Sequence, residues 1–433
     1  MTNAIPTRSP AASVGTKGKN SPARVLFASL VGTTIEFFDF YVYATAAVLV
    51  FPHLFFPASD PTSATLQSFA TFSIAFFARP LGAILFGHYG DRIGRKATLV
   101  AALLTMGLST VAIGLLPGYE SIGVLAPLLL ALCRFGQGLG LGGEWGGAVL
   151  LATENAPAHK RSWYGMFPQL GAPIGLFLSS GVFWLLLHLI SQEDFLSWGW
   201  RVPFIASIVL IGVGLWVRLS ITETPEFQEA IEKRERVKVP VVEIFSKYKR
   251  SLFLGTFVAL VTFVLFYIVT AYLLSYNVKT LQIPFVDALL VQMVGAIFFG
   301  IAIPLSALMC DKYGRKTVLI ITTVLIGVFS FTLPSLLSAG LPGIYAFCAL
   351  GMVLMGMTYA PIGTTLAAPF PTAVRYTGAS MTFNFAGIFG ASLAPYIATS
   401  LARDYGLAYV GYYMLVAAAI TLLCILLSRD AEL

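Results

Sequence analysis

Charge is scarce in this chain. Only 11% of its 433 residues are Asp, Glu, Lys or Arg, whereas 57% are hydrophobic. A soluble globular protein carries roughly a quarter charged residues. The composition therefore excludes an ordinary water-soluble fold and predicts that lipid surrounds most of the chain.

Cysteine and histidine are also rare, with four of each. The cysteines lie in or at the ends of apolar runs at no regular spacing, so we expect packing roles and neither disulfides nor a metal site. They are Cys133, Cys310, Cys348 and Cys424. The histidines are dispersed and form no catalytic constellation. We therefore predict no metal, no cofactor and no enzymatic activity.

Long apolar runs are what the sequence has in abundance. A bilayer-spanning helix needs roughly 20 residues, and twelve runs reach about that length. They cover residues 25–51, 66–88, 98–116, 122–152, 162–188, 199–219, 251–275, 286–308, 318–338, 343–366, 377–402 and 406–428. The predicted fold is all-α and integral to the membrane, with twelve transmembrane helices.

A charged cluster occurs twice, as Gly90-Asp91-Arg92-Ile93-Gly94-Arg95-Lys96 and as Asp311-Lys312-Tyr313-Gly314-Arg315-Lys316. The spacing indicates an internal duplication into two pseudo-symmetric six-helix bundles, and transporters built this way bind substrate between the repeats. The predicted units are a disordered tail (1–24), an N-terminal bundle (25–219), an amphipathic linker (220–250), a C-terminal bundle (251–428) and a short tail (429–433).

The positive charges predict the orientation. If both termini are cytoplasmic, 22 of the 27 Lys and Arg residues fall at the cytoplasmic side, which obeys the positive-inside rule. The other five are Arg79, Arg134, Arg201, Lys279 and Arg403. The net charge of +7 then reflects basic cytoplasmic loops that face anionic membrane lipid, and it is not a sign of nucleic-acid binding.

The two clusters are candidate gates. We expect Asp91 to cap a helix end, and Arg95 and Lys96 to reach acidic partners on neighbouring helices, with Glu154 as the first candidate. The alternative is a topology anchor with no gating role. The gating candidates are Gly87, Gly90, Asp91, Arg92, Gly94, Arg95, Lys96, Glu154, Asp311, Gly314, Arg315, Lys316 and Arg375.

Several motifs together resemble one family. Gly87-x-x-Gly90-Asp91-Arg92-x-Gly94-Arg95-Lys96 resembles the loop 2–3 signature of the major facilitator superfamily, and Arg134-x-x-Gln137-Gly138-x-Gly140 resembles its fourth-helix motif. With Glu36-Phe37-Phe38-Asp39-Phe40-Tyr41 and Gly142-Gly143-Glu144, the pattern is similar to the metabolite:proton symporter family. The resemblance implies a central cavity, rocker-switch alternating access, a monomer and a bacterial inner membrane.

Two features depart from the family pattern. Ala368 stands where many relatives have an acidic residue at the end of the tenth helix. We therefore expect the charged contacts that close the C-terminal bundle on the cytoplasmic side to be weaker than in those relatives. Gly171-Ala172-Pro173-Ile174-Gly175 partly resembles a motif associated with antiporters.

Five charges lie inside the apolar runs, where an isolated charge is costly. Depth along ideal helices suggests Asp39 as the partner of Arg134, and leaves Glu36 and Glu144 in less compensated surroundings. On one continuous fourth helix, Gln137 and Glu144 share a face. A desolvated carboxyl favours its neutral form. We therefore expect Asp39, Glu36 or Glu144 to carry a coupled proton.

A guanidinium facing a cavity suits bidentate capture of a carboxylate. Arg79 and Arg134 are the candidates, although either could instead satisfy a buried carboxylate. The plausible polar lining groups, for which ordinary interhelical hydrogen bonding is equally expected, are Tyr41, Tyr43, Gln137, Gln169, Gln292, Tyr359 and Asn384.

These features predict proton-coupled symport of a small organic acid, whether a mono-, di-, hydroxy or aromatic carboxylate. The alternatives are uptake of a zwitterion or osmolyte such as proline or betaine, or a facilitator, exchanger or nutrient sensor on the same fold. The sequence does not distinguish the substrate.

Overall fold

The computed structural model describes residues 22–57, 60–93, 95–154, 156–220 and 240–429, without the side chains of 22, 87–99, 158, 240 and 373. These ranges fold mostly into helices and contain no strand. Ten of the helical stretches are long and apolar enough to cross a membrane, and Val100–Leu115 is a shorter apolar helix. The predicted all-α membrane fold is confirmed.

The N-terminal bundle follows the first six predicted runs. Its helices are α1 (Pro22–Leu49), α3 (Pro61–Ile93), α4 (Arg95–Leu115), α6 (Leu125–Gly142) with α7 (Trp145–Glu154), α8 (Arg161–Leu189) and α10 (Arg201–Leu219). Short helices α2 (Phe51–Leu54), α5 (Tyr119–Ile122) and α9 (Gln192–Asp194) lie in the connections.

The C-terminal bundle follows the other six runs. One span combines α13 (Lys249–Val258), α14 (Leu260–Tyr267), η3 (Ile268–Tyr272), α15 (Leu273–Ser275) and η4 (Tyr276–Thr280). The others are α16 (Phe285–Tyr313), α17 (Arg315–Ser330) with α18 (Leu333–Ser338), α19 (Gly340–Ala367), α20 (Thr372–Gly387) with η5 (Ile388–Ser392) and α21 (Ala394–Tyr405), and α22 (Leu407–Leu427). Helix α12 (Pro240–Lys247) precedes this bundle, and most of the predicted linker lies outside the described residues.

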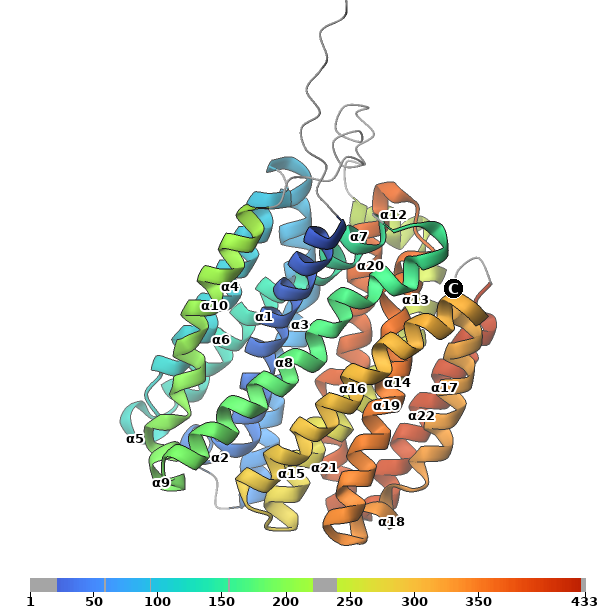
Figure 1. Ribbon diagram of the computed structural model, residues 1–433. Coiled ribbons are helices and arrows are strands. Elements are labelled where there is room, and N and C mark those ends of the chain that lie inside the picture. Colours follow the sequence, from blue (N-terminus) through green and yellow to red (C-terminus); the bar gives the residue numbers. More distant parts are fainter. Residues whose placement is uncertain (1–21, 58–59, 94, 155, 221–239, 430–433) are drawn as a thin grey trace, which may run out of the picture.

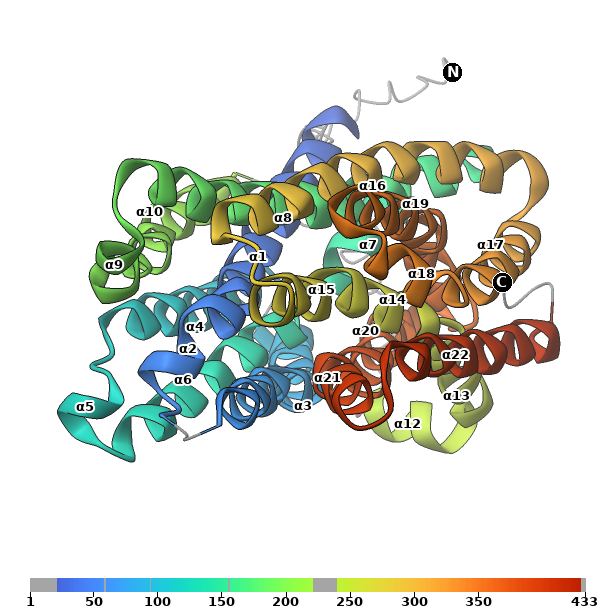
Figure 2. The same ribbon diagram turned by 90° about the horizontal axis from the view of Figure 1, so that it is seen from below.

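The bundles stand side by side, blue to green against yellow to red (Figures 1 and 2). Helix α8 packs along α16 and α19, and α3 packs against α20, η5 and α21, so helices of both bundles meet on two sides of a central axis. Large apolar side chains such as Leu132, Trp216 and Phe331 are more than 60% exposed on the outside. An apolar exterior around a packed interior is what lipid as solvent requires.

Close backbone contact fixes α6 against α3. A Cβ atom on Gly142 would overlap the carbonyl oxygen of Arg79, and one on Gly138 would overlap that of Ala75. The predicted fourth span then breaks, because α6 ends at Gly142 and α7 begins at Trp145. The expectation of one continuous helix through Glu144 is therefore wrong: Gly142 and Gly143 interrupt it.

The two ends of the bundles need names. The tail face is the end that holds Ser220, Gly314 and Ser428; the distal face is the end that holds His53 and Lys279. At the tail face, α16 ends and α17 begins around Gly314, whose φ of +87° suits only glycine. The second charged cluster therefore contains a tight turn between two helices, as its place between two apolar runs indicates.

Candidate substrate and proton site

A closed cavity lies between the bundles, close to their common axis. Its volume is about 20 Å³, room for about one water molecule. Helices α1, α3 and α6 line one side and α14, α19 and α20 the other. The lining residues are Glu36, Phe37, Phe40, Tyr41, Arg79, Leu141, Phe263, Phe266, Tyr267, Met355, Tyr359 and Phe383.

Glu36 and Arg79 form a loose ion pair in this cavity. Arg79 Nη2 lies 3.6 Å from Glu36 Oε1, and the two side chains are only 6% and 1% exposed. That distance exceeds a hydrogen bond. Both oxygens of Glu36 and Nε of Arg79 lack a hydrogen-bond partner in the structure. Buried polar atoms are nearly always hydrogen-bonded, so these open positions mark a place for water or a ligand.

A second acid–base pair lies beside the first, toward the tail face. Arg218, in the last turn of α10, reaches Glu144 with Nη2 2.9 Å from Oε1. Its guanidinium passes Gly32, where a Cβ would lie 3.8 Å from Nη2. Glu144 is also close enough to Glu36 to act on it electrostatically. We expected Glu36 and Glu144 to be less compensated than Asp39. Each instead faces an arginine, although both oxygens of each carboxyl lack a hydrogen-bond partner among the described residues.

Arg134 and Asp39 are not an ion pair, which corrects a second expectation. Arg134 donates from Nε to Phe72 O at 3.2 Å and from Nη1 to Gln137 Oε1 at 3.0 Å. Asp39 accepts a hydrogen bond of 2.6 Å from Ser207 Oγ on α10. Depth along a helix fixes the height of a side chain but not the direction in which its neighbours lie.

A polar chain nevertheless runs between Arg134 and Asp39. Gln137 Nε2 donates to Thr110 Oγ1 at 2.9 Å, and Thr110 lies beside the carboxyl of Asp39. Arg134 itself lies within 4.8 Å of the centres of three rings, those of Phe40, Tyr43 and Phe72. Arg134, Gln137 and Tyr43 are therefore enclosed behind the cavity wall and do not line it.

The remaining predicted polar groups lie either in the wall of a cavity or at the seam, the interface where helices of the two bundles pack against each other. Tyr41 and Tyr359 line the central cavity. Gln292 lines a smaller cavity on the distal side of Tyr41 and Tyr267, and accepts a hydrogen bond of 3.1 Å from Ser180. Tyr41 and Tyr267 border both spaces and separate them.

On the tail side, the cavity is closed by contacts across the seam. Trp145 stacks on Phe383 with centroids 3.7 Å apart and donates to Gln169 Oε1 at 3.0 Å. Gln169 in turn donates to Tyr359 O at 2.9 Å, and Asn384 donates to Gly142 O at 3.3 Å. Gln169 and Asn384 thus join the bundles and do not face the cavity.

Two gating candidates of the second cluster, and the further candidate Arg375, form hydrogen bonds at the tail face. Asp311 accepts hydrogen bonds of 3.1 Å from the backbone N–H groups of Ser162 and Trp163, at the start of α8. A carboxylate at a helix N-terminus is stabilised there. Lys316 donates to Ser428 O at 2.9 Å and Arg375 to Phe370 O at 3.0 Å. The side chains of the first cluster lie outside the described residues.

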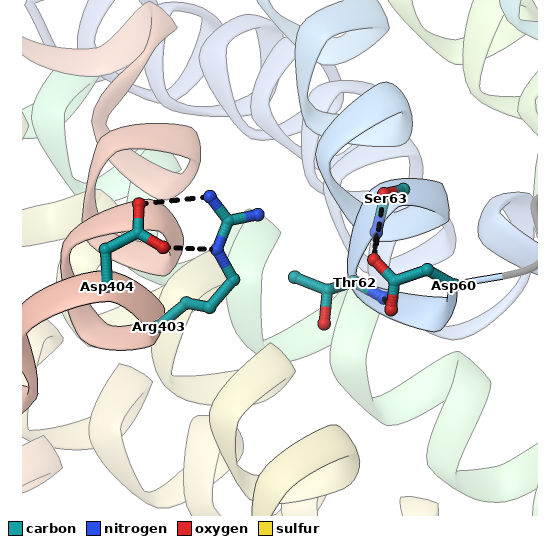
Figure 3. Close-up of polar contacts among 5 residues, drawn as sticks. All are labelled: Asp60, Thr62, Ser63, Arg403 and Asp404. Atoms are coloured by element: carbon teal, nitrogen blue, oxygen red, sulfur yellow. Dashed lines mark hydrogen bonds and ion pairs between the residues drawn. The ribbon is translucent and has the colours of Figure 1, made fainter.

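The distal face is closed as well. Lys279 of η4 lies 3.1 Å from Nε2 of His53, which connects the two bundles. Burial and the charge of Lys279 lower the pKa of His53. Figure 3 shows a neighbouring polar group, where Asp60 caps the start of α3 through Ser63 and Arg403 binds Asp404 at 2.7 and 3.0 Å. The residues that line the central cavity are all buried, at most 7% exposed, so the cavity is largely shielded from solvent.

The sequence did not reveal most of the cavity wall on the C-terminal side. Phe263, Phe266 and Tyr267 of α14 and Phe383 of α20 face the Glu36–Arg79 pair. No sequence signal marked them: every residue of α14 is buried, but burial follows only from the fold. Arg218 was missed because it stands at a helix end, where a basic residue is expected for topology.

Two six-helix bundles around a buried cavity that holds a loosely paired acid and base define a secondary membrane transporter. The chain belongs to the major facilitator superfamily, whose family model, described as Major Facilitator Superfamily, matches residues 29–392.

The relatives agree with this family. The chain is 56% identical to the Inner membrane metabolite transport protein YhjE of Escherichia coli (strain K12), with 95% of each chain covered. It is 34% identical to the Shikimate transporter of the same organism, over 96% of this chain and 97% of that one. It is 33% identical to the Proline/betaine transporter, over 92% and 82%. These relatives confirm the metabolite:proton symporter family and a multi-pass metabolite transporter that is not an enzyme.

Solved structures support the fold. The chain resembles a crystal structure of the D-xylose-proton symporter with a TM-score of 0.71 at 18% identity, covering 93% of this chain and 96% of that one. At this identity the likeness concerns architecture alone.

Proposed function

We propose that this protein carries a small organic acid together with a proton across the membrane by alternating access. The observation that carries the proposal is the Glu36–Arg79 pair, which lines a cavity between the bundles with its hydrogen-bonding positions unfilled. Arg79 supplies the charge and geometry that bind a carboxylate. Glu36, once protonated, no longer competes for Arg79.

This competition gives a physical route to coupling. While Glu36 is ionised, it neutralises Arg79, and a substrate anion entering the cavity meets no net positive charge. Protonation of Glu36 releases the guanidinium for the substrate, so proton and anion are bound together. Glu144, which lies next to this pair toward the tail face with Arg218 as its counter-ion, is then the carboxylate positioned to receive the proton from Glu36.

The orientation proposed is that of the positive-inside rule, with the tail face and both termini cytoplasmic in a bacterial inner membrane. A monomer is sufficient, because the cavity is formed within one chain. A cysteine introduced at exposed Ser246 of α12 should react with a membrane-impermeant maleimide only from the cytoplasmic side. Labelling from the outside would reverse the orientation.

A second candidate is a zwitterion of the proline or betaine kind. One observation favours it: an ionised acid and a base 3.6 Å apart can hold an ammonium and a carboxylate respectively. The relative named for proline and betaine is 33% identical over 92% of this chain and 82% of its own length.

The test is uptake into proteoliposomes with an imposed inward proton gradient, using shikimate, 2-oxoglutarate, citrate, short monocarboxylates, aromatic acids, proline and betaine. We expect an acid to accumulate and a protonophore to collapse the accumulation. Arg79→Gln should abolish it, whereas Arg403→Gln, a change at the distal face, should not. Accumulation of a zwitterion would favour the second candidate, and uptake indifferent to the gradient would indicate a facilitator.

A further inference from the structure

We propose that the cavity accepts a monocarboxylate with a compact, mostly apolar body, bound with one proton on Glu36, so that transport is electroneutral. The inference rests on the proposed function and narrows its substrate. Because the cavity of about 20 Å³ holds about one water molecule, its wall must move outward to admit the ligand.

The number of cations at the cavity sets the charge of the ligand. Arg79 is the only Lys or Arg among the described residues that line it. Arg134 is fully buried and directed at Phe72 O and Gln137, and Arg218 is held by Glu144. With Glu36 neutral, the site therefore carries one positive charge, which one carboxylate balances. A second carboxylate would be buried without a partner, which is strongly unfavourable.

The unfilled hydrogen-bonding positions also fit a single carboxylate. Arg79 Nε and the hydroxyl of Tyr359 are buried without a partner, and so are both oxygens of Glu36. One carboxylate can accept from Arg79 through both of its oxygens. It can accept further from the protonated Glu36 and from Tyr359, because an ionised carboxylate offers about four acceptor positions.

The rest of the wall selects the body of the ligand. It consists mainly of Phe and Tyr rings with Leu141 and Met355, which favour an apolar or flat group. These rings do not form a free cage for a quaternary ammonium ion. The guanidinium of Arg79 already lies 5.7 Å from the centres of the Phe40 and Phe383 rings. A second cation there would be repelled by Arg79.

Binding to the purified full-length protein tests the charge of the ligand without requiring transport. The probes are two pairs matched in their carbon body, benzoate with phthalate and butyrate with succinate, together with glycine betaine. Thermal unfolding is followed at increasing ligand concentration, since a ligand that binds the folded state raises the midpoint. We expect at least one monocarboxylate to bind at least ~10-fold more tightly than its dicarboxylate partner.

Arg79→Gln should lose this stabilisation, and Arg403→Gln should keep it. The proposal is overturned if a dicarboxylate binds as tightly as its matched monocarboxylate, if betaine binds more tightly than both monocarboxylates, or if neither monocarboxylate stabilises the protein.

Flux measurements test the electroneutral step and separate the two proposals. In proteoliposomes, with protein-free liposomes subtracted for passive entry of the acid, a proton gradient should drive accumulation of the bound monocarboxylate. A potassium potential set with valinomycin should not, whereas movement of one net charge would change the accumulation ratio by about 50-fold per 100 mV. A response to potential overturns electroneutrality. Binding without any response to the proton gradient overturns the proposed function and leaves the ligand class standing.

Discussion

The N-terminal and C-terminal bundles share an architecture but contribute different chemistry to the cavity. Among the described residues, every charged side chain at or behind the cavity comes from the N-terminal bundle, namely Glu36, Asp39, Arg79, Arg134, Glu144 and Arg218. The C-terminal bundle contributes rings, a thioether and hydroxyls, namely Phe263, Phe266, Tyr267, Met355, Tyr359 and Phe383. Duplication supplied two scaffolds; proton and charge chemistry is concentrated on one, and the other forms the apolar wall.

The largest expected effect comes from removing the titratable group at the cavity. Glu36→Gln should abolish uptake driven by a proton gradient, because a neutral amide cannot load and release a proton. Exchange of labelled for unlabelled substrate across the membrane should continue, since Arg79 is then permanently free. Glu243→Gln, a change at the surface of α12 beside Lys247, is the matched control. Gradient-driven accumulation in the Glu36 variant would place the coupled proton elsewhere.

The second effect concerns stability within the charged bundle. Arg218→Met leaves Glu144 buried without its counter-ion and should lower the free energy of unfolding by about 3 kcal/mol, the scale for removing one partner of a buried pair. The double variant Arg218→Met, Glu144→Gln should recover most of that loss, because no isolated charge remains. Thermal unfolding in detergent measures both. A double variant no more stable than the single one would show that the arginine acts by packing alone.

The third effect tests the backbone contact that positions Arg79. Gly142→Ala places a methyl group against the Arg79 carbonyl and should cost about 2 kcal/mol through overpacking. Gly212→Ala is the control, since a Cβ at Gly212 meets nothing within 4 Å and alanine favours the helix. Equal thermal stability of the two variants would mean that α3 and α6 separate at little cost.

The sequence predicted the scaffold well, because length and apolarity determine membrane spans almost independently of tertiary contacts. The run 406–428 matches α22 to within one residue at each end. The run 286–308 begins one residue after α16 begins and ends five residues before α16 ends. The break at Gly314 could be expected because a charged cluster separates two apolar runs there. The untested boundaries of the two units stay predictions.

The site was predicted only in part, for a geometric reason. Glu36 and Arg79 stood out, since a charge in an apolar run is costly, but their pairing depends on how α1 and α3 are rotated toward each other. Reasoning from depth alone paired Asp39 with Arg134 instead. The rings of the C-terminal wall gave no signal, because a phenylalanine facing the cavity and one facing lipid are identical in sequence.

The fourth prediction concerns that apolar wall. Tyr359→Phe removes a buried hydroxyl without a partner in the structure, and keeps the ring. Loss of one hydrogen bond to substrate should raise KM about fivefold, equivalent to about 1 kcal/mol, with coupling intact. Tyr412→Phe, at an exposed position, should behave as wild type. Loss of coupling in the Tyr359 variant would show that the C-terminal bundle also takes part in proton coupling, which would contradict the proposed difference between the bundles.

The smallest effect is a pH dependence at the distal face, where the two bundles meet through His53 and Lys279. The pKa of His53 is lowered by burial and by Lys279, so the folded protein favours the neutral ring, whose Nε2 accepts a hydrogen bond from Lys279. The contact is therefore fully present above the ordinary pKa of about 6.5. It is lost as the pH falls through the lowered value, because a protonated ring repels Lys279. For a partly exposed pair the stability involved is about 0.5 kcal/mol.

His53→Gln keeps an acceptor but removes the titration. The unfolding midpoint of the wild type should fall more than that of this variant between pH 8 and pH 5.5. His188→Gln is the matched control, because Nδ1 of His188 lies 2.9 Å from Trp184 O on its own helix and its contact does not join the bundles. If His53→Gln and wild type showed the same pH profile, the distal contact would not titrate. The acid response would then come from other titratable groups, and the contact between the two bundles at the distal face would not depend on pH.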